Sequence, residues 1–115
     1  MFKKGTIVLI PFPFADLSLI KVRPALIISS NPIKGDDIVA AFISSFKSKK
    51  LQNTDIALNV SNPNFKKTGL KDSSIIKINK IATLDKKIVI GELGEIDKSI
   101  QKKVNQKIKL LFDLL

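Results

Sequence analysis

The sequence predicts a mainly β domain of the α+β class, a small and partly open β-barrel with an amphipathic helix at its C-terminal end. Short apolar or alternating segments recur between turn-forming residues, a pattern typical of small barrels. Helical spacing of apolar residues is strong only after residue 97. About six short strands in so small a sheet are expected to curl rather than stay flat.

The whole chain, residues 1–115, is expected to form a single domain. Lysine or aspartate interrupts every apolar segment, so none is expected to span a membrane. The N-terminal apolar run is interpreted as a first strand, Thr6–Ile10, and not as a signal peptide, because Pro11 and Pro13 break it.

The segment Pro11–Lys21 is expected to be a loop. Prolines are excluded from central strands, and Asp16 and Ser18 favour turns. Further turns carry Gly, Pro or Asn, or are rich in lysine; they are expected at Asn31–Asp36, Phe46–Asn53, Ser61–Leu70 and Thr83–Lys87.

Five more strands are expected between these turns. The first of them is apolar on both faces, which indicates a central position, and the third alternates loosely, as an edge strand does. In the fourth, Ile76 and Ile78 alternate with Lys77 and Asn79, as in a half-exposed strand. These strands are expected at Pro24–Ser29, Ile38–Ser44, Thr54–Val60, Ser73–Ile81 and Ile88–Leu93.

The C-terminal helix has Asp97 as its natural N-cap. One apolar stripe at helical spacing is expected to dock on the barrel; it consists of Ile100, Val104, Ile108, Leu111 and Leu115. Lysines fill the other faces, and a solvated surface is favoured over a nucleic-acid contact for them.

Composition restricts the chemistry. A net charge of +10 favours a polyanionic partner such as nucleic acid, although a lysine-rich solvated surface or an acidic protein partner would also account for it. The chain has no cysteine and no histidine, so no disulfide and no zinc site is expected. No other metal and no cofactor is predicted either. The absence of cysteine also fits a reducing cytoplasm.

Arg23 is the single arginine beside nineteen lysines. Its planar fork can hold two phosphate oxygens together, which lysine cannot do. The alternative is a structural arginine that caps the sheet or pairs with an aspartate.

Four stretches resemble the PemK/MazF-like toxins, the ribonuclease components of bacterial type II toxin–antitoxin pairs. They are GTIVLIPFPFADLSLIKVRPALIISS at Gly5–Ser30, IVAAFISS at Ile38–Ser45, GLKDSSIIKINKIATLD at Gly69–Asp85, and IGELGEID before the helix. The resemblance implies an SH3-like barrel, a homodimer, metal-independent cleavage of single-stranded RNA such as mRNA, and neutralisation by an acidic antitoxin.

The same resemblance implies two catalytic residues. Arg23, in V-R-P, matches the family's catalytic arginine, and Ser44, in F-I-S-S, matches a position that is often threonine and sometimes serine. The loop between Pro11 and Arg23 is shorter than in several family members, and it is expected to control which RNA enters.

Cleavage would proceed by attack of the RNA 2′-OH on its own phosphate. Arg23 can stabilise the phosphorane, and Ser44 can donate one more hydrogen bond. Asp16 is a candidate general base, but a turn-forming role is favoured for it. A site without a base would lose roughly 10²–10⁴ in rate.

Other residues are expected to bind the RNA chain. Exposed phenylalanines would stack on bases, although burial in the core is their usual fate, and lysines would contact phosphates. The candidates are Phe12, Phe14 and Phe46, and Lys21, Lys47, Lys49 and Lys50.

Two other functions stay open at this point. A non-catalytic protein on the same barrel could bind RNA or poison DNA gyrase, which the lack of histidine favours. A lysine-rich structural or ribosome-associated module is the third.

Overall fold

The computed structural model describes residues 2–13, 20–30, 35–46 and 50–114. Within these residues the strands are β1 (Thr6–Pro13), β2 (Ile20–Ile27), β3 (Asp37–Ser45), β4 (Asp55–Leu58), β5 (Ser74–Asp85) and β6 (Gly91–Glu95). The helices are α1 (Lys98–Leu111) and two 3-10 turns, η1 (Phe65–Thr68) and η2 (Lys86–Ile88).

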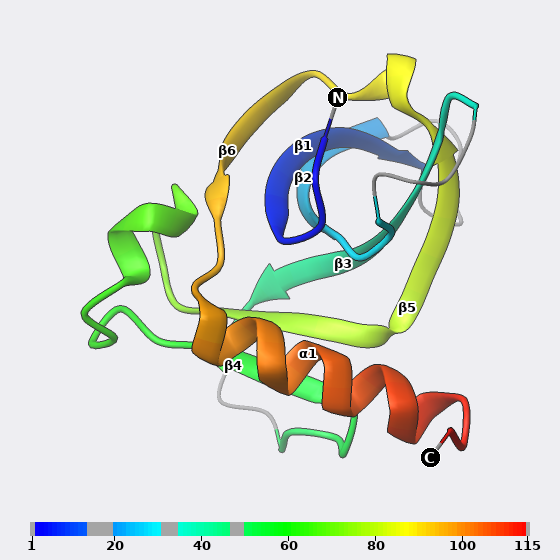
Figure 1. Ribbon diagram of the computed structural model, residues 1–115. Helices are drawn as coiled ribbons and strands as arrows, with labels where there is room; N and C mark the ends of the chain where they lie inside the picture. The colour runs from blue at the N-terminus through cyan, green and yellow to red at the C-terminus, as the bar shows by residue number, and fades with distance from the viewer. Residues whose placement is uncertain (1, 14–19, 31–34, 47–49, 115) are drawn as a thin grey trace.

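All six strands form one antiparallel sheet in the order β4-β5-β3-β2-β1-β6. The sheet curls into an open half-barrel, and α1 runs across it at β4 and β5 (Figure 1). This confirms the predicted fold class, the central position of β2 and the edge position of β4. No helix in the described ranges is long and apolar enough to cross a membrane.

The predicted loop Pro11–Lys21 is wrong at both ends, because β1 continues through Pro13 and β2 begins at Ile20. The direction of the backbone groups explains why prolines are tolerated. The Leu9 carbonyl accepts a hydrogen bond from the N–H of Ile90, at 2.8 Å. The backbone N–H and C=O groups of Leu9 therefore point away from β2.

Pro11 and Pro13 have the same orientation as Leu9, because backbone groups alternate sides along a strand. Pairing of β1 with β6 ends at Leu9 and Gly91. The missing N–H groups therefore face the free edge of β1 and not its partner β2, which is where a sheet accepts proline.

Side chains divide between two apolar clusters on opposite faces of the sheet. The first cluster lies under α1 and η1 and includes Ile7, Leu26, Ala41, Ile43, Ile56, Leu58, Phe65, Ile76, Ile78, Ile96, Ile100 and Val104. The second cluster contains Val8, Ile10, Ala25, Ile27, Ile38 and Ala40, with Phe2, Phe42, Leu84 and Val89 packed against it. Neighbouring residues of β1 and β2 thus alternate between the clusters.

The helix follows the sequence prediction over Lys98–Leu111, and Leu115, the last residue of the predicted stripe, lies outside the described residues. An Asp97 carboxylate oxygen accepts a hydrogen bond from the N–H of Ile100 at 2.8 Å, which caps the first turn. Ile100 and Val104 are buried in the first cluster, and Ile108 and Leu111 pack against it. Each such side chain contributes about 1.5–3 kcal/mol when fully buried.

The boundaries near the end of the sheet differ from the prediction. The predicted turn Thr83–Lys87 is wrong over residues 83–85, where β5 continues along the first half of β3, and the chain turns only at η2, from Lys86. The last strand is Gly91–Glu95 rather than Ile88–Leu93, because η2 occupies residues 86–88. The predicted turn region Ser61–Leu70 contains η1.

A bulge makes the length of β5 possible. Ala41 pairs with Ile81 and the next residue of β3, Phe42, pairs with Lys77, so residues 78–80 have no partner on β3. Such a bulge bends its strand, and one β5 can therefore follow β3 around the curl and also pair with β4.

Candidate functional site

Arg23 lies on the face of the sheet that carries the second apolar cluster. Its partner on β1 is Ile10, and Ala25 and Ile27 follow it on the same side of β2. The side chain is half-buried. Arg23 therefore projects beside the second cluster and away from the face that α1 covers.

Ser44 lies on the same face of the neighbouring strand β3. It alternates with Ala40, which belongs to the second cluster, and with Phe42, which packs against that cluster. The register of β2 and β3 pairs Ala25 with Phe42. Continued by two residues, this register puts Arg23 opposite Ser44.

Pairing between β2 and β3 stops just before this point, and Pro24 supplies a reason. The N–H of Ile28 donates to Val39 of β3 at 2.9 Å, and position 24 points to the same side by alternation. Proline has no N–H to donate there. Arg23 and Ser44 thus flank a place where the two strands are no longer paired.

The Ser44 hydroxyl makes no hydrogen bond in the described part of the chain. The hydroxyls of three other serines do: Ser29 and Ser73 accept from backbone N–H groups, and Ser74 donates to a backbone carbonyl. The half-buried hydroxyl of Ser44 is therefore available to a ligand.

Lys21 and Phe46 come next along the same two strands. Lys21 is exposed and pairs with Phe12 of β1, and Phe46 directly follows β3 with 37% of its surface exposed. The prediction that Phe12 lies on a loop is wrong, because Phe12 is part of β1.

Of the remaining predicted residues, only Lys50 lies in the part of the chain that the structure describes. Lys50 is exposed in the segment that leads to β4, at the edge of the sheet. Asp16, Phe14, Lys47 and Lys49 lie outside the described residues.

Three residues that the sequence did not single out share the face of Arg23 and Ser44. Lys77 pairs with Phe42, and Ile75 pairs with Ser44, both across β3 and β5. Asp55 of β4 pairs with Lys77 from the other side. No motif could indicate these neighbours, because the bulge in β5 fixes which residues face Phe42 and Ser44.

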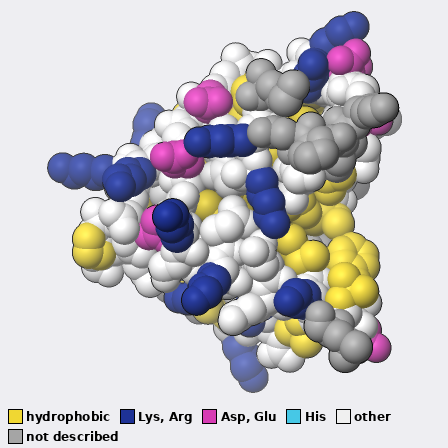
Figure 2. Space-filling model, in the orientation of Figure 1, with side chains coloured by type: hydrophobic (Ala, Val, Ile, Leu, Met, Phe, Trp, Pro, Cys, Tyr) yellow, Lys and Arg dark blue, Asp and Glu magenta, His cyan; other side chains and the backbone are white. Residues whose placement is uncertain are grey.

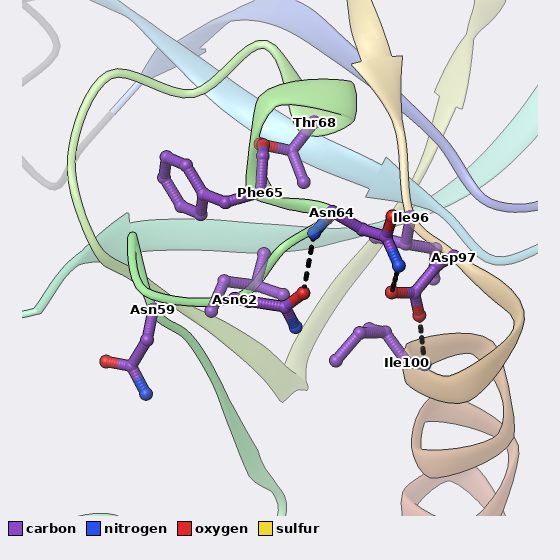
Figure 3. A pocket seen from close by; sticks show the side chains of 9 residues that line it. Asn59, Asn62, Asn64, Phe65, Thr68, Ile96, Asp97 and Ile100 are labelled. Atoms are coloured by element: carbon purple, nitrogen blue, oxygen red, sulfur yellow. Dashed lines mark hydrogen bonds between the residues drawn. The ribbon is translucent and has the colours of Figure 1, made fainter.

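A recess elsewhere on the molecule, where η1 meets the start of α1, has a structural explanation (Figure 3). The Asn64 side-chain amide donates to Asp97 at 3.0 Å, and the Asn64 N–H donates to the Asn62 side chain at 2.8 Å. These bonds connect η1 to the helix cap.

The Asp97 carboxylate has a pKa below its ordinary value of 3.8. The hydrogen bond from the Ile100 N–H is the largest cause, the Asn64 amide adds to it, and burial opposes both. The charged form is therefore favoured at the helix N-terminus, as expected for a cap.

Lysine side chains are spread over the face of the molecule that carries α1, with acidic side chains between them (Figure 2). On the helix, Lys98, Lys102, Lys103 and Lys109 are exposed. This distribution fits a solvated lysine surface.

Comparison with known proteins matches the chain, over residues 3–112, to the model of the PemK-like, MazF-like toxin of type II toxin–antitoxin systems. Among solved structures, a mycobacterial endoribonuclease in complex with its cognate antitoxin superposes with a TM-score of 0.78 and 20% identity, covering 100% of this chain and 98% of that one.

Two other solved structures are also similar. The Mycobacterium tuberculosis toxin MazF-mt6 has a TM-score of 0.74 at 18% identity, covering 96% of this chain and 98% of its own. A MazE-MazF complex from Deinococcus radiodurans has 0.72 at 19% identity, covering 99% and 97%. No curated protein matches the sequence significantly. At these identities the structures establish the fold.

Proposed function

The chain belongs to the PemK-like, MazF-like toxin family of type II toxin–antitoxin systems, and from this premise we propose that it is an endoribonuclease of single-stranded RNA. Cutting mRNA in the cytoplasm would inhibit translation and growth. The observation that carries the proposal is the placement of Arg23 and Ser44 on one face of adjacent strands, at the point where strand pairing ends.

The proposed reaction is a transesterification within the RNA. The 2′-oxygen forms a bond to the adjacent phosphorus, the bond from phosphorus to the 5′-oxygen breaks, and the 2′-proton passes to a base while the 5′-oxygen gains a proton. The products are a 2′,3′-cyclic phosphate and a 5′-OH end. The nucleophile belongs to the substrate, so the step requires no metal-bound water.

Arg23 has the role of phosphate clamp. Two parallel N–H donors on the non-bridging oxygens stabilise the charge that develops in the phosphorane, and the leaving 5′-oxygen can receive a third hydrogen bond. Arg23 stays protonated in proteins, so it cannot also be the general base.

Ser44 has the role of second donor to the phosphate. Its hydroxyl lacks a partner in the described chain and lies on the strand adjacent to Arg23. It is not proposed as a covalent nucleophile, since the chain has no histidine to activate it.

Asp16 is kept as the candidate general base, because it precedes Arg23 in the sequence and the described residues of the site offer only the largely buried Asp55 as another carboxylate. Acid–base help contributes about 10²–10⁴ to a rate. A toxin that needs few cuts per message can act without all of it.

RNA binding is assigned first to Lys21 and Phe46, which flank Arg23 and Ser44 along their strands. An exposed phenyl ring supports base stacking, and an exposed ammonium supports a phosphate contact. Phe12, Phe14, Lys47, Lys49 and Lys50 are further RNA-binding candidates from the sequence.

The partners proposed are a second copy of the chain and an acidic antitoxin. The family implies both, and the net charge of +10 supports an acidic partner. The homodimer is checked by sedimentation at micromolar concentration, where a monomer would count against it.

The proposed function is tested with a mixture of fluorescent single-stranded RNAs in EDTA. We expect wild type to cut and to leave 2′,3′-cyclic phosphate ends, and Arg23→Ala to lose roughly 10²–10³ in rate, the cost of removing a charge-stabilising donor. Equal melting temperatures would show that both proteins are folded.

Absence of cutting by wild type, or equal cutting by Arg23→Ala, would contradict the proposal. RNA or gyrase binding without cleavage at any enzyme concentration would instead support the non-catalytic binding protein. Salt-sensitive RNA binding that does not depend on Arg23 would support a structural module.

A further inference from the structure

We infer that Lys77 is a further RNA-binding residue of this site, and that its ammonium contacts a phosphate next to the scissile one. The inference rests on the proposed function, because it adds a residue to the same RNA-binding face. According to this inference β5 also binds the substrate, whereas the sequence motifs indicated catalytic residues only on β2 and β3.

Strand register places Lys77 beside Ser44. Phe42 pairs with Lys77 and Ser44 pairs with Ile75, so Lys77 and Ser44 are diagonal neighbours on one face. Diagonal cross-strand neighbours are about 7–8 Å apart, within reach of a long side chain. This separation is comparable with that between consecutive phosphates of one RNA strand.

The surface between Ser44 and Lys77 is apolar. Phe42 packs against the second cluster, and Ile75, between Ser44 and Ala57 in the register, is 5% exposed. A phosphate in contact with this apolar surface is partly shielded from water. Shielding strengthens its attraction to nearby cations.

Lys77 itself is half-buried. Of the described carboxylates, none lies within ion-pair distance of its ammonium. An ammonium that has no carboxylate within ion-pair distance can pair with an anionic ligand on this face, and a phosphate of bound RNA would be such a ligand.

The nearest candidate for a partner is Asp55, but no ion pair joins its carboxylate to the Lys77 ammonium. Asp55 is opposite Lys77 on β4 and only 7% exposed. One of its oxygens accepts the N–H of Gln52 at 2.9 Å, and the other has no hydrogen-bond partner among the described residues. Although this acceptor is unoccupied, the Lys77 ammonium does not pair with it.

Lys80 offers a matched control on the same strand. It lies in the bulge, where β5 has no partner on β3, and its side chain is exposed. Replacement of either lysine by methionine removes one positive charge and keeps a long apolar stem. Differences between the two variants therefore report position and not net charge.

The test measures binding of a random 2′-O-methyl oligonucleotide mixture, which cannot undergo the cleavage step, by fluorescence anisotropy at several salt concentrations. We expect Lys77→Met to weaken binding about 5–10-fold and to lower the log–log salt slope by about 0.7, the value for one phosphate contact on a single strand. We expect Lys80→Met to change affinity less than about twofold, and Lys77→Arg to keep most of it.

A cleavage assay on wild type and Arg23→Ala separates this inference from the proposed function. If wild type cuts RNA and Lys77→Met binds as Lys80→Met does, Lys77 is not an RNA-binding residue while the proposed function stands. If wild type does not cut, the proposed function fails. If Lys77→Met has a lower melting temperature than wild type, the RNA affinity of Lys77→Gln is measured in its place. Equal RNA affinity of Lys77→Gln and wild type would overturn the inference.

Discussion

The two faces of the sheet differ in which parts of the chain cover them. On the face under α1, side chains of β1, β2, β3, β4 and β5 meet side chains of α1 and η1, and the chain fills its own core. On the opposite face, the second cluster ends beside Arg23, Ser44 and Lys77, polar groups at the edge of an apolar surface. One face is completed by the helix of the same chain, whereas the other carries the polar residues that are proposed to bind RNA.

The difference arises within single strands, because neighbouring residues point to opposite faces. Ile76 is fully buried under the helix, and Lys77 lies on the other face. The comparison predicts that substitutions under the helix reduce stability, and that substitutions on the opposite face reduce RNA cleavage.

The largest effect is expected at Arg23. Arg23→Lys keeps the charge and loses the planar fork, so cleavage should fall by about 10² or more, similar to loss of a preorganised donor. The melting temperature should stay near that of wild type. Single-turnover cleavage rates and thermal unfolding measure the two quantities; near-normal cleavage would mean that charge alone is sufficient.

Ile76→Ala should have the opposite consequence. Removal of a buried isoleucine leaves a cavity in the first cluster and should lower the free energy of unfolding by about 2–5 kcal/mol. Denaturant titration measures this loss. Cleavage per folded molecule should not change, and a specific loss of activity would show that the two faces are coupled.

Ser44→Ala should reduce cleavage by roughly 10–100-fold, since a hydrogen bond to a charged group contributes about 1.5–3 kcal/mol. Ser44→Thr keeps the hydroxyl and should keep most activity. Steady-state rates at saturating RNA distinguish the two variants. Equal activity of Ser44→Ala and wild type would remove Ser44 from the site.

Asp97→Ala should have the smallest effect, a loss of about 1 kcal/mol from the missing helix cap. The folded pKa of Asp97 is lowered, so the contribution of its charge is fully present above the ordinary pKa and is lost as pH falls through the folded value. Thermal unfolding between pH 2 and 7 should therefore show wild type and Asp97→Ala converging at low pH.

Asp97→Asn is the matched control for this prediction, because asparagine also caps helices but carries no charge. Its stability should lie between those of wild type and Asp97→Ala at pH 7. A constant difference between wild type and Asp97→Ala over the whole pH range would contradict the role of the charge.

Local patterns in the sequence were sufficient for several elements. The cap at Asp97, the helix stripe from Ile100 to Leu111 and the alternation along β5 from Ile76 to Asn79 each depend on residues close together in the chain, and each is confirmed. The family motif likewise drew attention to Arg23 and Ser44, whose catalytic roles stay predictions.

Only the tertiary structure decided the features that depend on partners far away in the chain. Pro11 and Pro13 could enter β1 because β6 ends at Leu9 and their missing N–H groups face a free edge. Lys77 came to lie beside Ser44 because a bulge sets the register of β5 on β3. Sequence periodicity fixes which residues share a face of one strand, but hydrogen bonds between strands fix which residues of different strands meet.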